Sequence, residues 1–207
     1  MTPSVADELL ALGTATLGES GAAVLHPRLK AVWPGARLAA PAFTVQCPAG
    51  DNLAVHVAVA EAPPGAALVV DGTAEPARGY WGEVLTTAAE ARGLTGLVLD
   101  GGVRDVDALA AHRFPVFSAL VALRGAAKEA GGTVGGPVTV GDVEVRTGDW
   151  VVADTDGVVV IAAADLDAVL SAARTRAEKE QGLFTALRAG QTTIELLGLE
   201  KNNVRRA

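Results

Sequence analysis

Short apolar runs alternate with helical segments through the first half of the chain, and this alternation limits the fold more than any other feature. Ala67–Val70 and Gly96–Leu99 have the length of strands, and each run ends in an Asp-Gly turn signal. The segment Trp81–Arg92 between them is predicted to be helical, with Gly93 just beyond its C-terminus. Strands that alternate with helices predict βαβ units and at least some parallel pairing.

The flanking segments continue this pattern. Apolar residues at helical spacing, turn signals at paired prolines and runs of small and β-branched residues mark the further elements. We predict helices over residues 4–12, Asp51–Glu61 (capped by Asp51) and Val106–His112, and strands over Arg37–Gln46 and from Pro115 to Phe117.

The second half of the sequence has a different pattern. Residues 134–161 are rich in valine and are interrupted by Gly141-Asp142, Gly148-Asp149 and Asp156-Gly157. Such turn residues between β-branched runs predict a hairpin-rich β block.

The C-terminal part of the sequence is predicted to be helical. A long amphipathic helix runs from Asp165 to Ala189, and a last helical turn lies near Thr193–Leu197. No linker, low-complexity run or internal repeat separates the segments of the chain. We therefore expect residues 1–207 to form a single domain.

Composition narrows the range of functions. The single cysteine, Cys47, excludes an intramolecular disulfide and a cysteine-rich zinc site. A net charge of −7 argues against a nucleic-acid surface, and no uncharged apolar run approaches the ~20 residues of a membrane span. The acidic N-terminus lacks the basic region of a signal peptide. We therefore expect a cytoplasmic protein with no nucleic-acid or membrane partner.

The hydrophobic residues are mostly small. They make up half of the chain, yet only 4% of all residues are aromatic. A core of alanine and valine buries less area per residue than a core of larger side chains. We therefore expect oligomerisation to supply part of the stability.

The residues at two predicted loop ends have the groups needed to bind an anion and a cation. Gly82 lies at the start of a predicted helix, where the free backbone N–H groups of Val84 and Leu85 can hold an anion. Arg104 has the planar fork that fits a carboxylate, and Asp105 is an oxygen ligand of the kind that Mg²⁺ prefers. Together these groups suit a small 2-oxo acid, whose keto and carboxylate oxygens a metal would bridge.

A purely structural explanation fits the same residues. Asp105 can cap the helix that follows it, and Glu83 is an acid of the kind favoured at a helix N-terminus. On spacing alone, capping explains Asp105 better than metal binding does. Asn52 and His56, four residues apart on one helix face, are further pocket candidates. For His56, a place in the core or in a subunit interface is the simpler explanation.

A longer pattern surrounds these residues. Gly79-x-x-x-Glu83 is followed, after twenty residues, by Arg104-Asp105. With its flanking segments, the chain from about Gly35 to Ile161 resembles the RraA-like family of divalent-metal pyruvate aldolases. This family includes 4-hydroxy-4-methyl-2-oxoglutarate (4-carboxy-4-hydroxy-2-oxoadipate) aldolase and the regulator of ribonuclease activity A. The matching segments are Pro34–Leu38, Pro41–Val45, Gly50–Leu53, Val69–Gly72, Trp81–Leu85, Gly101–Asp105, Phe114–Phe117, Gly148–Asp154 and Asp156–Val160.

The resemblance implies an α/β fold of the swivelling-domain type. Its three layers are β/β/α, with a mixed sheet and a long C-terminal helix. It also implies a homotrimer or a dimer of trimers, with active sites in the clefts between subunits.

The resemblance further implies roles for the site residues. Asp105 would bind Mg²⁺ or Mn²⁺ directly, and Glu83, where many members have Asp, would support the metal through water. Arg104 would bind the pyruvate moiety of a small 2-oxo acid. The substrate carboxylate would be held by backbone groups at Gly82, Val84 and Leu85.

The activity implied is retro-aldol cleavage of a 4-hydroxy-2-oxo acid through a metal-stabilised pyruvate enolate. Decarboxylation of oxaloacetate through the same enolate is the expected side activity. The alternative within the family is a non-catalytic trimeric regulator that binds a ribonuclease or another protein. Retention of both Arg104 and Asp105 favours the enzyme. Ser118–Gly125 departs from the loop that many members have, so the distal part of the substrate and the general base stay open.

Overall fold

Four parallel strands lie at the centre of the computed structural model, which describes residues 4–200 and 204–205. Crossovers with helices connect these strands, so the predicted βαβ units are confirmed. In sheet order the strands are β3 (Leu38–Gln46), β4 (Ala67–Asp71), β6 (Gly96–Val103) and β7 (Val116–Val121). The helices are α2 (Leu53–Glu61), α3 (Glu83–Ala91) and α4 (Val106–His112).

Antiparallel strands extend this sheet at both ends, so the sheet is mixed. β11 (Trp150–Ala153) pairs with the first part of β3, followed by β12 (Val158–Ile161) and β1 (Ala23–Val24). At the other end β2 (Lys30–Ala31) pairs with β7. Two short strands, β5 (Gly79–Trp81) and β8 (Thr133–Val134), pair with β6 and β3. A separate hairpin consists of β9 (Val138–Val140) and β10 (Val143–Val145).

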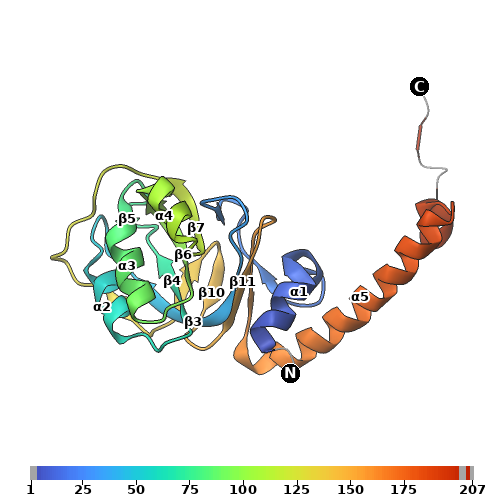
Figure 1. Ribbon diagram of the computed structural model, residues 1–207, viewed down its shortest axis with the longest axis horizontal. Helices are drawn as coiled ribbons and strands as arrows, with labels where there is room; N and C mark the ends of the chain where they lie inside the picture. Colours follow the sequence, from blue (N-terminus) through green and yellow to red (C-terminus); the bar gives the residue numbers. More distant parts are fainter. Residues whose placement is uncertain (1–3, 201–203, 206–207) are drawn as a thin grey trace.

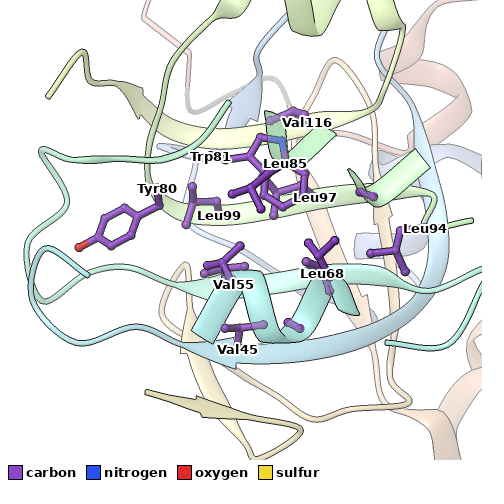
Figure 2. Packing of buried hydrophobic residues seen from close by; sticks show 14 of the residues in the cluster. Val45, Val55, Leu68, Tyr80, Trp81, Leu85, Leu94, Leu97, Leu99 and Val116 are labelled. Carbon is purple, nitrogen blue, oxygen red and sulfur yellow. The ribbon is translucent and has the colours of Figure 1, made fainter. Parts of the chain in front are cut away.

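Hydrophobic residues are buried on both faces of the parallel strands. The crossover helices cover one face, where Leu85 and Leu97 belong to one cluster (Figure 2). The other face packs against the β9–β10 hairpin and the antiparallel strands through Val69, Val98 and Val140. A helix layer, a parallel sheet and a second β layer are therefore stacked (Figure 1). This arrangement confirms the expected fold class.

Two more helices pack on the antiparallel part of the sheet. α1 (Val5–Gly18) and the first turns of α5 (Leu166–Arg188) bury Leu9, Leu17 and Leu170 against β11 and β12. A 3-10 turn at residues 163–165 precedes α5. α5 then projects away from the body and leads to α6 (Thr193–Leu197), as Figure 1 shows. The long C-terminal helix is thus confirmed. Within the described part of the chain, no helix is long and apolar enough to cross a membrane.

Three details near the ends of the parallel strands differ from the prediction. Trp81 belongs to β5, because its segment pairs with the end of β6, and α3 begins only after Gly82. Asn52 rather than Asp51 is the N-cap of α2. Asp105 occupies the N-cap position of α4, but its carboxylate makes no capping hydrogen bond. The carboxylate of Asp51 still accepts the N–H of Leu53 at 2.8 Å, whereas that of Asp105 takes no part in capping α4.

Candidate active site

Arg104 and Asp105 lie where β6 ends and the chain turns into α4. The residues of β6 are buried along its whole length, and the N–H of Arg104 donates to the Trp81 carbonyl at 2.9 Å. Asp105 has φ +58° and ψ +38°, the left-handed region that aspartate tolerates better than most residues. Nε of Arg104 lies 3.8 Å from Oδ2 of Asp105. The guanidinium and the carboxylate are thus neighbours at the end of the central sheet.

Helix α3 begins against this pair. The backbone N–H of Glu83 donates a hydrogen bond to Oδ2 of Asp105 at 3.1 Å. A Cβ placed on Gly82 would overlap that same oxygen and lie 3.2 Å from Cγ of Arg104. Since Gly82 has no side chain, the N-cap residue itself caps none of the first N–H groups of α3, and Asp105 accepts only that of Glu83. The start of the helix therefore presents partial positive charge beside Arg104 and Asp105.

The side chain of Glu83 contacts α4. Its Oε1 lies 3.7 Å from Nε2 of His112, whose Nδ1 is 2.8 Å from Oε2 of Glu90. More than half of the Glu83 side chain is exposed to solvent. The water-mediated role of Glu83 at a metal stays a prediction.

A cavity of about 220 Å³ opens beside the start of α3. Seven of the eight residues singled out in the sequence line it, and Glu83 does not. These seven are Asn52, His56, Gly82, Val84, Leu85, Arg104 and Asp105. The lining is completed by Gly79, Tyr80, Trp81 and Lys128.

Buried aromatic residues support the cavity wall. Trp81 stacks on Phe114 with ring centroids 6.0 Å apart, and its Nε1 donates to Oγ1 of Thr86 at 2.7 Å. Figure 2 shows Trp81 beside Leu85 in the cluster of buried hydrophobic residues. The Tyr80 hydroxyl is held as well, because it donates to a carbonyl at 2.9 Å and accepts from a backbone N–H at 3.1 Å. This wall is fixed by packing and hydrogen bonds.

Asn52 and His56 lie together at the start of α2. Nδ2 of Asn52 donates to the Tyr80 carbonyl at 2.8 Å, which leaves Oδ1 as the free end of the amide. Oδ1 of Asn52 and Nε2 of His56 are buried, and neither has a hydrogen-bond partner among the described residues. Burial and the ammonium group of Lys128 lower the pKa of His56. Because unpaired buried polar atoms are rare, the two atoms call for a hydrogen-bond partner from outside the chain, a water or a ligand.

Lys128 comes from a segment that borders the cavity, residues 124–130, which we call the strap. The carboxylate of the buried Asp51 accepts hydrogen bonds from two backbone N–H groups of the strap, at 2.5 and 2.9 Å. The N–H of Asn52 donates to the strap carbonyl of Ala127 at 2.9 Å. Asp51, which the sequence assigns to a helix cap, therefore ties the strap to the start of α2.

Comparison with known proteins identifies the family. A family model described as RraA-like, Aldolase/RraA, matches residues 2–160. The chain belongs to the RraA-like family. A relative from Halalkalibacterium halodurans, named for a proposed 4-hydroxy-4-methyl-2-oxoglutarate aldolase activity, is 35% identical over 147 residues. The match covers 71% of this chain and 70% of the relative.

Solved structures agree with this membership. An uncharacterized protein from Pseudomonas syringae pv. tomato is 28% identical to this RraA-like chain, with a TM-score of 0.82. That match covers 93% of this chain and 92% of the other. The structure described as the RNA-processing inhibitor RraA from Thermus thermophilis is 29% identical, with a TM-score of 0.62. It covers 68% of this chain and 85% of its own.

The cavity of this RraA-like chain fits a hard divalent cation. Asp105 supplies a carboxylate, and the missing Cβ of Gly82 leaves space at its Oδ2. Within residues 4–200 and 204–205, no three His, Cys, Asp or Glu side chains form a metal-binding group. Mg²⁺ is commonly held by one or two carboxylates together with waters and substrate oxygens. The donor set of this chain suits that mode, with Asp105 as the residue that would hold the ion.

Sequence reasoning did not assign four lining residues to the site, and Lys128 is the charged one among them. With Glu129 beside it, it lies among alanine and glycine residues between positions 125 and 132, without a recognisable motif. Its place beside His56 depends on the strap and on Asp51, which are far apart in sequence. A single cation within a run of small residues is the signal that could have drawn attention to it.

Proposed function

We propose that this protein is a divalent-metal-dependent pyruvate aldolase that cleaves a 4-hydroxy-2-oxo acid. One observation carries the proposal: a single cavity is lined by Arg104, by Asp105 and by Val84 and Leu85 in the first turn of α3. Each of these groups suits one part of a 2-oxo acid. The relative that is 35% identical and named for such an aldolase activity supports the same function.

Different residues of the chain bind the substrate carboxylate, the metal and the pyruvate moiety. The N–H groups of Val84 and Leu85 bind the substrate carboxylate, since a helix N-terminus favours an anion. Asp105 would hold Mg²⁺ or Mn²⁺, which supplies Lewis acidity toward the 2-oxo group when bound. Arg104 binds the pyruvate moiety and places a fixed positive charge where negative charge develops as the C3–C4 bond breaks. Cleavage of a 4-hydroxy-2-oxo acid and decarboxylation of oxaloacetate then give the same pyruvate enolate.

Glu83 is proposed to support the metal through water. Its carboxylate would have to leave the exposed contact with His112 and turn toward the cavity. Exposed pairs of this kind contribute at most about 1 kcal/mol, so the rotation costs little.

The test is metal-dependent release of pyruvate. With Mg²⁺ or Mn²⁺, the purified protein should release pyruvate from oxaloacetate and from a 4-hydroxy-2-oxo diacid, followed with lactate dehydrogenase and NADH. Asp105→Ala and Arg104→Ala should each lower kcat/KM by at least about 10²-fold. Arg146→Ala, which removes an exposed arginine that pairs with Glu144, is the matched control and should leave kcat/KM unchanged. Full activity in the first two variants would contradict the proposal.

A second function is favoured by one comparison, the likeness to an RNA-processing inhibitor. A regulator of that kind would act by protein contact and would need no metal. In that case the wild-type protein would release no pyruvate with any divalent metal, while Asp105→Ala and Arg104→Ala would still bind the protein partner normally. The same two variants therefore distinguish the two functions.

We also propose a homotrimer or a dimer of trimers with its sites in the clefts between subunits. α5 projects from the body and exposes Phe184, and α6 exposes Ile194 and Leu197, which leaves apolar surface for another subunit to cover. Light scattering after size exclusion should give a multiple of three times the chain mass of 20.9 kDa. A monomer would contradict this assembly.

A further inference from the structure

The proposed retro-aldol cleavage requires a group that accepts the proton of the 4-hydroxyl. Of the titratable side chains that line the cavity, Arg104 and Lys128 are cations and Asp105 faces the cation that it would hold. The Tyr80 hydroxyl already donates to a backbone carbonyl. His56 is the remaining base in the lining.

The hydrogen bonds around His56 define what the cavity wall can bind there. The amide of Asn52 is oriented by the Tyr80 carbonyl, so its Oδ1 can only accept a hydrogen bond. Nε2 of His56 is also unpaired within the described chain, and it is an acceptor in the tautomer protonated at Nδ1. Both residues line the cavity, and two acceptors without a partner call for a donor. A substrate hydroxyl can donate a hydrogen bond to these acceptors, whereas an ionised carboxylate has no proton to donate.

We propose that His56 is the catalytic base that accepts the 4-hydroxyl proton of the substrate at Nε2, with Asn52 Oδ1 beside it to orient the hydroxyl. This inference rests on the proposed function, because it assigns a residue to a step of that reaction. It supplies the proton acceptor that the sequence left open.

The step balances without any further reactant. The O–H bond breaks, its proton passes to Nε2 of His56, and its electron pair forms the C4 carbonyl. The C3–C4 bond breaks, and its electron pair enters the C2–C3 unit to give the pyruvate enolate. The imidazolium then loses its proton to solvent, while water supplies the proton that C3 takes up. Pyruvate and a carbonyl compound leave, and His56 is neutral again.

The electrostatic setting keeps His56 ready for this role. Burial and the positive charge of Lys128 on the strap lower its pKa, so the ring is neutral and able to accept a proton at pH 7. The other charged groups that line the cavity are Arg104 and Asp105 at the end of β6. A neutral imidazole beside a cationic strap suits a base that must be unprotonated before each turnover.

The experiment compares two reactions of the same enzyme. Decarboxylation of oxaloacetate passes through the same enolate, but it begins from an ionised carboxylate and has no hydroxyl proton to remove. His56→Gln should therefore lower kcat for aldol cleavage by about 10²-fold or more, the usual contribution of a general base. The kcat for decarboxylation should stay within about threefold of wild type, as expected for a step that does not use the base. His26→Gln, a change of a histidine in the loop before β2, is the matched control and should leave both reactions unchanged.

A second measurement does not depend on how the variant folds. The ring of His56 can be titrated by NMR in the metal-free wild-type protein, where the three histidines are assigned from single variants. Its pKa should lie below the ordinary histidine value of about 6.5. In the wild-type enzyme, the acid limb of the pH profile for cleavage should follow this pKa, and decarboxylation should show no matching limb.

Each other outcome is decisive. A parallel loss of both activities in folded His56→Gln, or unchanged cleavage, would overturn the assignment, and the second result would make water the proton acceptor. An acid limb shared by both reactions would overturn it as well. A wild-type protein that decarboxylates oxaloacetate but cleaves no 4-hydroxy-2-oxo acid would remove this inference and leave the enolate chemistry standing. A wild-type protein with neither activity would remove the proposed function itself.

Discussion

The carboxylate of Asp105 accepts a hydrogen bond from the backbone N–H of Glu83, 3.1 Å away, and so joins the end of β6 to the start of α3. The two residues are 22 positions apart in the chain. The contact is close because Gly82 lies between the helix start and the carboxylate with no side chain. The geometry of the candidate site therefore depends on a glycine as much as on the charged residues.

Gly82→Ala tests this dependence. Gly82 has φ −170°, an extended conformation that alanine adopts without strain. The new Cβ would overlap Oδ2 of Asp105, so the carboxylate must move while the fold stays intact. We expect kcat/KM to fall by about 10²-fold, as for a displacement of about 1 Å in a site, and stability to fall by about 1–3 kcal/mol. Steady-state kinetics and urea denaturation measure the two effects.

Gly136→Ala is the control for this change. A Cβ at Gly136 would meet no atom within 4 Å, so activity and stability should both be close to wild type. Full activity in Gly82→Ala would show that the contact with Asp105 does not fix the site.

Asp51→Ala should loosen the strap. It removes the acceptor of two backbone N–H groups of the strap and of the N–H of Leu53. Buried donors left without a partner cost about 1–3 kcal/mol each, partly relieved by water, so we expect a loss of about 2–3 kcal/mol in urea denaturation. Limited proteolysis should cut the strap faster, and pyruvate release should fall because Lys128 is displaced.

Asp71→Ala, in an exposed turn with Thr73, should cost less than about 1 kcal/mol. Equal stability of the two variants would contradict this role of Asp51.

Arg28→Met should destabilise the protein through Asp100. Arg28 donates two hydrogen bonds to this buried carboxylate, at 2.8 and 2.7 Å, and remains about one-third exposed. Removing one partner of a buried pair leaves an uncompensated charge, so we expect a loss of about 3 kcal/mol. A double variant with Asp100→Asn should recover part of it, because no buried charge remains. Arg146→Met, in an exposed pair, should cost no more than about 0.5 kcal/mol.

Stability should fall in acid because of three carboxyl groups, those of Asp51, Asp100 and Asp154. Burial alone would raise the pKa of each, but hydrogen bonds outweigh burial and lower it; the donors include Arg28 and Thr14. The unfolded chain, with ordinary aspartate pKa values near 3.8, then takes up protons first as the pH falls. The three carboxylates therefore contribute their full share of the free energy of unfolding above about pH 5. This share is lost progressively below about pH 4. Urea midpoints between pH 7 and 3 measure it, and Arg28→Met should show a weaker dependence. A midpoint that rises in acid would contradict this account.

The central βαβ units could be predicted because their signals are local. Apolar runs of strand length and turn residues identify Ala67–Val70 and Gly96–Leu99 without tertiary information. β5 could not be predicted, because Gly79–Trp81 is only three residues long and becomes a strand by pairing with β6. The helix predicted over residues 4–12 continues to Gly18, with a kink where Gly13 has φ +78°. Local sequence patterns therefore predict the order of the helices and strands more accurately than the residues at which they begin and end.

The candidate site also contains residues that could be predicted from the sequence and residues that could not. Arg104, Asp105 and Gly82 could be singled out because a longer pattern surrounds them, and the structure brings them to one cavity. The roles of Asp51 and Lys128 depend on hydrogen bonds between segments nearly eighty residues apart, which no local spacing records. Those contacts are tertiary, and they place a cation beside His56.

Lys128→Met tests that last contact through the pH profile. The ammonium group lowers the pKa of His56, so its removal should raise that pKa. If His56 must be neutral to accept a proton, the acid limb of kcat/KM for aldol cleavage should move to higher pH in the variant. Added salt should move the limb in the same direction in the wild type, since the charge on this exposed strap is screened, and should have less effect in Lys128→Met. Lys179→Met, on the projecting part of α5, is the matched control and should leave the limb in place. A limb that stays fixed or moves to lower pH in Lys128→Met would contradict the coupling between the strap and His56.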